Sequence, residues 1–171
     1  MSIAIKNTPF SGIRIRIDTP LSFDKIGARL RNLARNASPR EITDLAANVD
    51  SWEEFARLVN QRFVGESGFM VFADIDHGAW ISRAGIQRRT VRWILGNPLF
   101  AITMMRHDLD AGLFVPVELL MTEHSDGQGA TVLYVRPSSL ISVPGSNAQL
   151  RAAAQDLDQK VEALVTSITG V

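Results

Sequence analysis

The sequence contains no cysteine, and this absence removes several classes of protein at once. Without thiols there is no disulfide framework, no thiolate nucleophile and no cysteine-ligated metal. An excess of charge of one sign is also missing, since eighteen basic residues balance eighteen acidic ones. A balanced chain has no overall field to hold a nucleic-acid backbone or an anionic membrane surface. We therefore predict no nucleic-acid partner, and the remaining chemistry must use carboxylates, histidine, hydroxyls, arginine or a bound ligand.

Long apolar runs are missing as well. The start, MSIAIKNTPF, has no continuous apolar stretch followed by a small-residue cleavage site, so we expect no secretory signal. The longest candidate for a membrane span, residues 93–105, is too short for a bilayer and is interrupted by a Gly-Asn-Pro sequence. We predict a cytoplasmic chain that makes no contact with a membrane.

The chain has the composition of one ordinary globular domain over residues 1–171, because 46% of its side chains are hydrophobic and 21% are charged. Strict alternation in IRIRID, residues 13–18, predicts a strand with one exposed face. Helix starts follow Ser22, Ser38 and Ser51, which are good N-cap residues. The last two also have a glutamate three residues later, which predicts capping boxes.

Further strands follow this helical section. FMVFADI, residues 69–75, is apolar on both faces in its first half, which is typical of a strand covered on both sides. Apolar strands are also predicted over 91–95 and 112–121, and Pro116 in the latter favours an edge position or a bulge. SDGQG then turns the chain so that ATVLYV returns as a hairpin partner. Because helices and strands are segregated, we predict an α+β two-layer sandwich with helices packed on a mainly antiparallel sheet.

Four stretches, in this order, resemble one known family: GFMVFADIDHGAWISRAGI, ILGNP, AGLFVPVELLMTE and DGQGATVLYVRPSSL. They are similar to the conserved region of domain of unknown function 302, a bacterial and fungal family, over roughly residues 65–145. The N-terminal strand and helices over 12–63 and a long amphipathic closing helix over 147–168 are compatible with the same domain. The resemblance implies a small α+β domain, often paired as a homodimer, whose activity is not established.

Three residues are candidates for catalysis. Asp76 and His77 stand where the strand over 69–75 ends, and a carboxylate beside an imidazole suits acid–base chemistry. The structural alternative is that Asp76 only caps the following turn. Glu118 lies within FVPVELLM, where a carboxylate needs an explanation: it faces a ligand, lies at an exposed edge or forms an ion pair with Arg92.

A second group of residues suits ligand binding. The Gly-Asn-Pro sequence precedes a predicted helix, and free N–H groups at a helix start can hold phosphate or carboxylate. Arginines lie just before it, and aromatic residues of the family-like region can line an apolar pocket. The structural alternatives are a tight strand-to-helix turn, a solvated run of arginines and ordinary core packing. The candidate ligand-binding residues are Trp80, Arg88, Arg92, Gly96, Asn97, Pro98 and Tyr134.

Three functions remain open at this point. The first is binding of a small, partly apolar, anionic ligand between the sheet and its helices. The second is a cofactor-independent isomerase, lyase or hydrolase, which requires His77 and Glu118 to face one cavity. The third is a dimeric scaffold protein with no small-molecule site. Metal-ligand spacing such as His-Glu-x-x-His is absent from the sequence, and we predict neither a metal nor a cofactor.

The apolar strands also bear on assembly. Strands that are apolar on both faces need cover on both sides, and one layer of helices hides only one face of a sheet. Either a second subunit or the helices over 38–62 must therefore hide the other face. This is the sequence argument for a homodimer.

Overall fold

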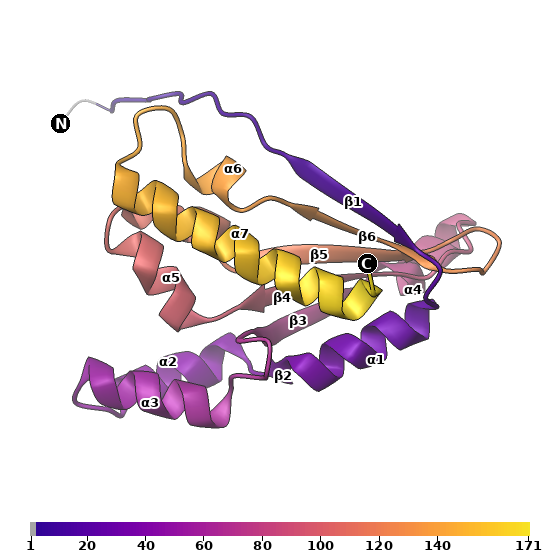
Figure 1. Cartoon of the computed structure of the whole chain (residues 1–171), viewed down its shortest axis with the longest axis horizontal. Coiled ribbons are helices and arrows are strands. Elements are labelled where there is room, and N and C mark those ends of the chain that lie inside the picture. Colours follow the sequence, from indigo (N-terminus) through magenta and orange to yellow (C-terminus); the bar gives the residue numbers. More distant parts are fainter. Residues whose placement is uncertain (1–2) are drawn as a thin grey trace.

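The computed structural model describes residues 3–171 and contains one six-stranded sheet with helices packed around it (Figure 1). The strand order is β1-β6-β5-β4-β3-β2, and all neighbours are antiparallel except β2 and β3, which run parallel. The predicted α+β class with a mainly antiparallel sheet is confirmed. The strands are β1 (Arg14–Thr19), β2 (Arg35–Asn36), β3 (Met70–Asp76), β4 (Thr90–Gly96), β5 (Val117–Glu123) and β6 (Ala130–Val135).

The helices that follow Ser22, Ser38, Ser51 and Asn147 begin where the sequence predicts them. Ser22, Ser38, Ser51 and Asn147 each cap the helix that follows, and the long closing helix is the last element of the chain. None of the described helices has the length and apolarity needed to cross a membrane. The helices are α1 (Phe23–Leu33), α2 (Pro39–Ala47), α3 (Trp52–Arg62), α4 (His77–Ile81), α5 (Pro98–Met105), α6 (Ser138–Ile141) and α7 (Ala148–Thr169), with 3₁₀ segments η1 (Ser82–Ala84) and η2 (Leu109–Phe114).

One of the two predicted capping boxes is complete and the other is not. At the start of α2, Ser38 accepts a hydrogen bond from the N–H of Glu41, whose carboxylate accepts one from the N–H of Ser38. At the start of α3, Ser51 caps the N–H of Glu54, but the Glu54 carboxylate lies 3.8 Å from Arg57 instead. Because Arg57 competes for this carboxylate, the predicted hydrogen bond from the Ser51 N–H to the Glu54 carboxylate does not form, and this part of the prediction is wrong.

The prediction for residues 112–121 is wrong in its first half. Residues 109–114 form η2, and β5 begins only at Val117. The strand then pairs with β4 on one side and β6 on the other, so it is central and not an edge. Pro116 has no N–H to donate to a neighbouring strand, which is why pairing on both sides starts after it.

One face of the sheet carries the main core. Helix α7 lies along this face, and α1 and α5 both contact α7 (Figure 1). Alternate side chains of the central strands point toward these helices, as period-two alternation requires. The fully or nearly fully buried strand residues of this core are Val71, Trp93, Leu95, Val117, Leu119, Met121, Ala130, Val132 and Tyr134.

Among residues 3–171, helices that form a core with the sheet cover the opposite face only at one end. Helices α2 and α3 form a smaller core with the start of β3, through Leu45, Phe55, Val59 and Met70. The predicted role of the 38–62 helices in covering the second face is therefore fulfilled only beside β3. The rest, which we call the open face, carries the outward side chains of β1, β6, β5 and β4 and the end of β3. Its members include Ile75, Arg14, Arg16, Asp18, Arg92, Ile94, Glu118, Leu120, Leu133 and Val135.

Candidate functional site

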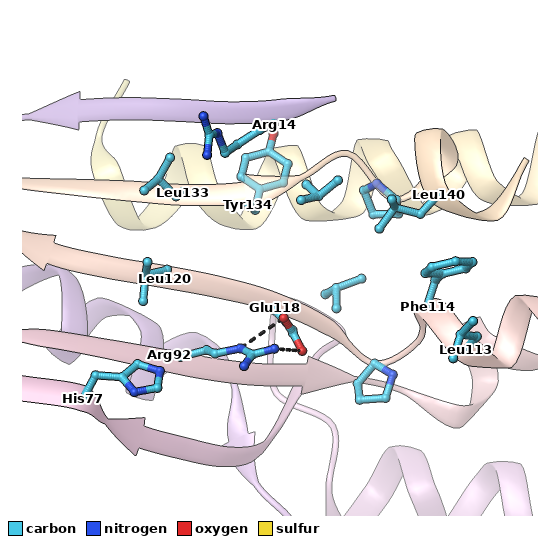
Figure 2. Close-up of a pocket in the computed structure, with 14 residues that line it drawn as sticks. Arg14, His77, Arg92, Leu113, Phe114, Glu118, Leu120, Leu133, Tyr134 and Leu140 are labelled. Atoms are coloured by element: carbon cyan, nitrogen blue, oxygen red, sulfur yellow. Dashed lines mark hydrogen bonds and ion pairs between the residues drawn. The ribbon is translucent and has the colours of Figure 1, made fainter. Parts of the chain in front are cut away.

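The open face is hollowed into a basin with a volume of about 520 Å³. Figure 2 shows Arg92 and Glu118 near its centre, His77 at one side and a group of apolar side chains toward η2 and α6. A concave site of this size with a few polar groups among apolar walls is typical of small-molecule binding. Its lining residues are Arg14, His77, Arg92, Leu113, Phe114, Pro116, Val117, Glu118, Leu120, Leu133, Tyr134, Val135, Pro137 and Leu140.

The charged centre of the basin is an ion pair. Arg92 donates from Nε to the Glu118 carboxylate over 3.0 Å, and its Nη2 contacts the other carboxylate oxygen. The two residues lie on adjacent strands, β4 and β5, and point to the same face. A two-pronged contact of this kind fixes the orientation of both side chains. This is the structural alternative that the sequence left open for Glu118, and it also places the pair inside a cavity.

His77 enters the basin from the first residue of α4, at the end of β3. Its ring packs edge-on against Trp80, with the ring centroids 5.7 Å apart. The Nδ1 atom is buried and has no hydrogen-bond partner in residues 3–171. Buried polar atoms in proteins usually have a partner, so this nitrogen is a candidate contact for a ligand.

Asp76 does not share this basin. Its Oδ1 accepts a hydrogen bond of 3.1 Å from the N–H of Ala79, so the carboxylate caps α4. It lines a separate polar cleft of about 400 Å³ together with Asp74, Arg88 and Arg89. Adjacent strand residues point to opposite faces, which is why Asp76 and His77 separate. The structure therefore brings His77 and Glu118 together and leaves Asp76 on the other side of the sheet.

The arginines before the Gly-Asn-Pro turn point to three different partners. Arg88 donates to the carbonyl of Glu123, Arg89 pairs with Asp24 over 2.5 Å, and Arg92 holds Glu118 as described above. No common anion site is formed by these three side chains. Among them only Arg92 lines the basin.

The Gly-Asn-Pro turn forms a tight strand-to-helix connection. Asn97 Oδ1 accepts from the N–H of Leu99 over 2.8 Å, and the Asn97 carbonyl accepts from Phe100 and Ala101. These bonds occupy the N–H groups that an anion at the start of α5 would need. Gly96, Asn97 and Pro98 instead line an apolar crevice beside the basin.

The last two predicted ligand-binding residues differ in their positions. Tyr134 lines the basin and is also part of the core, and burial, followed by the charge of Glu162, raises the pKa of its hydroxyl. Trp80 is 60% exposed and lines none of the three cavities described here. Among residues 3–171, no three histidine or carboxylate side chains gather closely enough to hold a metal ion.

Sequence reasoning missed several residues of the basin. The alternation in residues 13–18 predicts only that Arg14 lies on the outer face of a strand, and the predicted strand over 112–121 includes Leu113 and Phe114, which lie in η2. The β1–β6 register places Arg14 opposite Val135, which also lines the basin. Alternation identified the outer face of β1, but no feature of one sequence indicates which strand lies beside it.

The far end of the open face carries a second charged cluster. Asp18 accepts two hydrogen bonds from Arg16, of 2.9 and 2.7 Å, and one of 2.5 Å from the Thr131 hydroxyl. These bonds stabilise the carboxylate, Arg16 contributing most, and lower the pKa of Asp18 to about 2. This cluster ties the end of β1 to β6.

The Asp18 cluster predicts an acid dependence of stability. Because the folded pKa lies below the ordinary value, the contribution is fully present above about pH 5 and is lost as the pH falls toward 2. We expect Asp18→Asn to be less stable than the wild type at neutral pH and the difference to shrink steadily below about pH 4. Urea unfolding of both proteins between pH 2 and pH 7 measures this, and a pH-independent difference would contradict it.

Comparison with known proteins places the chain in a family. Residues 45–168 match the family model described as Domain of unknown function DUF302, which covers most of the chain. The protein therefore belongs to the DUF302 family, and the match extends beyond the region 65–145 that the sequence motifs indicated. No curated protein matches the chain.

A solved structure supports the same fold. The crystal structure of an uncharacterized conserved DUF302 protein from Bacillus stearothermophilus aligns with a TM-score of 0.61 and 15% sequence identity. The alignment covers 91% of this chain and 97% of the other. At this identity the likeness shows a shared fold and does not transfer an activity.

Proposed function

We propose that this protein binds a small, partly apolar anion in the basin of the open face. The observation that carries this proposal is the lining of one cavity by two arginines and an imidazole together with leucine and phenylalanine side chains. Arg14 and Arg92 carry two positive charges against the single negative charge of Glu118. The basin thus carries one positive charge that no carboxylate of its lining balances, and a ligand with one negative charge and an apolar group would complement it.

The apolar wall fits the same ligand class. Leu113 is 80% exposed at the rim of the basin, although leucine side chains are normally buried. Phe114 lies beside it and contacts Phe10 edge-on, with the ring centroids 5.7 Å apart. A bound hydrocarbon or aromatic group would remove this apolar surface from water, which is a favourable contribution to binding.

A thermal-shift screen tests the proposal. The probes are aliphatic and aromatic carboxylates and phosphate monoesters, each added in large excess to the wild type, to Arg14→Gln and to His77→Ala. A ligand at 100 times its Kd stabilises a protein by about 2.7 kcal/mol, which corresponds to a rise in Tm of roughly 5–10 °C at this size. We expect at least one carboxylate or phosphate class to raise Tm, and both variants to lose most of the effect.

Two matched controls make the result specific to the basin. Asp76→Asn changes a carboxylate on the opposite side of the sheet, and Arg40→Gln removes an exposed arginine of α2. Both should respond to the probes as the wild type does. A screen in which no anion stabilises any of the five proteins would refute the proposed binding function.

One observation favours a second candidate function, cofactor-independent proton transfer. His77 and Glu118 line the same basin, and an enzyme that uses both residues requires them to face one cavity. Because Arg92 holds both Glu118 oxygens, His77 is the better base. Deuterium exchange at the carbon next to the carboxylate of a bound probe, followed by proton NMR, tests this. Exchange that is present with the wild type and absent with His77→Ala supports an enzyme, and absence in both opposes it.

We also infer a homodimer in which a second copy covers the open face. In support, the apolar side chains of Ile75 and Val135 remain 39% and 38% exposed on this face. Sedimentation of the wild type and of Leu133→Arg over a dilution series tests the inference. We expect a concentration-dependent dimer for the wild type and a monomer for the variant, and a wild-type monomer at all concentrations would oppose it. The cytoplasmic location stays a prediction from the sequence.

A further inference from the structure

An apolar crevice of about 420 Å³ lies beside the basin, around the turn at residues 96–98. Its walls come from β3, β4, α5 and the segment that leads into β5. They include Phe72, Ile94, Phe100, Met104 and Met105. No charged side chain of the described residues lines it.

Among the described residues, the one polar side chain that lines the crevice already has a hydrogen-bond partner at both its amide oxygen and its amide nitrogen. Asn97 accepts from the N–H of Leu99 through Oδ1 and donates from Nδ2 to the carbonyl of Gly68, both over 2.8 Å. A polar ligand would lose its bonds to water in this crevice and find no replacement, which is costly. The crevice therefore suits a hydrocarbon group whose polar end lies elsewhere.

The crevice and the basin share a wall. Pro116 and Val117 line both cavities. In addition, Ile94 of the crevice is the register partner of Glu118 of the basin, so the two side chains are neighbours on the same face. A chain that leaves the crevice therefore reaches the charged centre of the basin within a short distance.

The basin supplies the charge that the crevice lacks. Arg92 uses Nε and Nη2 for Glu118, and no hydrogen bond or ion pair within residues 3–171 involves its Nη1. Arg14 forms no ion pair within the described chain and is exposed at the other side of the basin. We propose that the two cavities together bind an aliphatic carboxylate, with the hydrocarbon chain in the crevice and the carboxylate at Arg92, while Arg14 adds a second positive charge across the basin. This inference rests on the proposed function and names its ligand class.

A chain-length series on the wild-type protein tests the inference. Butanoate, hexanoate, octanoate and decanoate are titrated by calorimetry, each below its micelle concentration. Burial of each additional methylene is expected to tighten binding by about fourfold until the crevice is filled. Decyltrimethylammonium, whose alkyl chain is one carbon longer than that of decanoate but whose head group is positive, should bind at least about tenfold more weakly than decanoate.

Two pairs of variants assign the two ends of the ligand. Ala101→Phe narrows the crevice from α5, so binding should no longer tighten with chain length although butanoate still binds. Its control is Ala163→Phe on the exposed side of α7, which should leave the tightening with chain length unchanged. Arg92→Gln should weaken every carboxylate about tenfold or more. Arg40→Gln, which removes an exposed arginine that lines neither cavity, should have no effect.

The outcomes separate this inference from the function on which it rests. Carboxylate binding that needs Arg92 but does not tighten with chain length would overturn the acyl-chain assignment and leave the basin as an anion site. No binding at any chain length, and no response to other anions in the screen, would overturn both. The series uses the wild type alone, so the result stands even where Ala101→Phe does not fold.

Discussion

Gly129→Ala should destabilise the protein by about 3–5 kcal/mol, which lowers Tm by roughly 10 °C or more. Gly129 closes the hairpin between β5 and β6 with a φ of +92°, a conformation that residues with a side chain rarely adopt. A Cβ atom at this position would also overlap the carbonyl oxygen of Thr19 and lie 3.1 Å from the Cα of Pro20. Both of these contacts are to backbone, so neither can yield without moving the end of β1.

The same hairpin provides a matched control. Gly127 has a similar φ of +72°, but nothing lies within 4 Å of a Cβ built there. Gly127→Ala should therefore show only the cost of the backbone conformation, about 1–2 kcal/mol. Thermal and urea unfolding of the two variants measure the difference. Equal destabilisation at both positions would show that the contact between this turn and the end of β1 is not formed.

Leu119→Ala is expected to cost about 3 kcal/mol, because this side chain is 0% exposed in the centre of the main core. Its neighbours include residues of β4 and β6 and the helices that cover this face. Removing three carbon atoms leaves a cavity that a close-packed interior fills only in part. Equilibrium urea unfolding gives the change in the free energy of unfolding.

Leu120→Ala is the matched comparison one residue further along β5. Leu120 points to the open face and is only partly buried, so the same substitution should cost under about 1.5 kcal/mol in dilute protein. If a second copy covers the open face, this cost should rise with protein concentration while the cost at Leu119 does not. Equal large costs at both positions in dilute protein would mean that the open face is buried within one chain.

The local elements were predicted well because their signals are local. Ser22 and Asn97 cap helices through bonds to residues two or three positions away, and the alternation in residues 13–18 is complete within one strand. The failures involve distant partners. Whether Glu54 closes a capping box depends on Arg57, and the start of β5 depends on pairing with strands on both sides.

The candidate site shows the same limit. The sequence singled out His77, Arg92 and Glu118, and the structure places them around one basin. The sequence also grouped Asp76 with these three residues. Whether Asp76 and His77 point to the same face depends on where β3 ends, and one sequence does not show that β3 continues through Asp76. Arg14 reaches the basin only because β1 lies beside β6, a contact between residues more than one hundred positions apart.

An NMR titration of uniformly ¹⁵N-labelled protein with octanoate tests whether the basin of the open face is the ligand site. We expect the amide shift changes to cluster on the open face, at Arg92, Glu118, Leu120 and Leu133 and at the neighbouring crevice. The amides around Asp74 in the polar cleft should stay unchanged. Changes centred on that cleft, or none at millimolar octanoate, would contradict the assignment of the open-face basin as the ligand site.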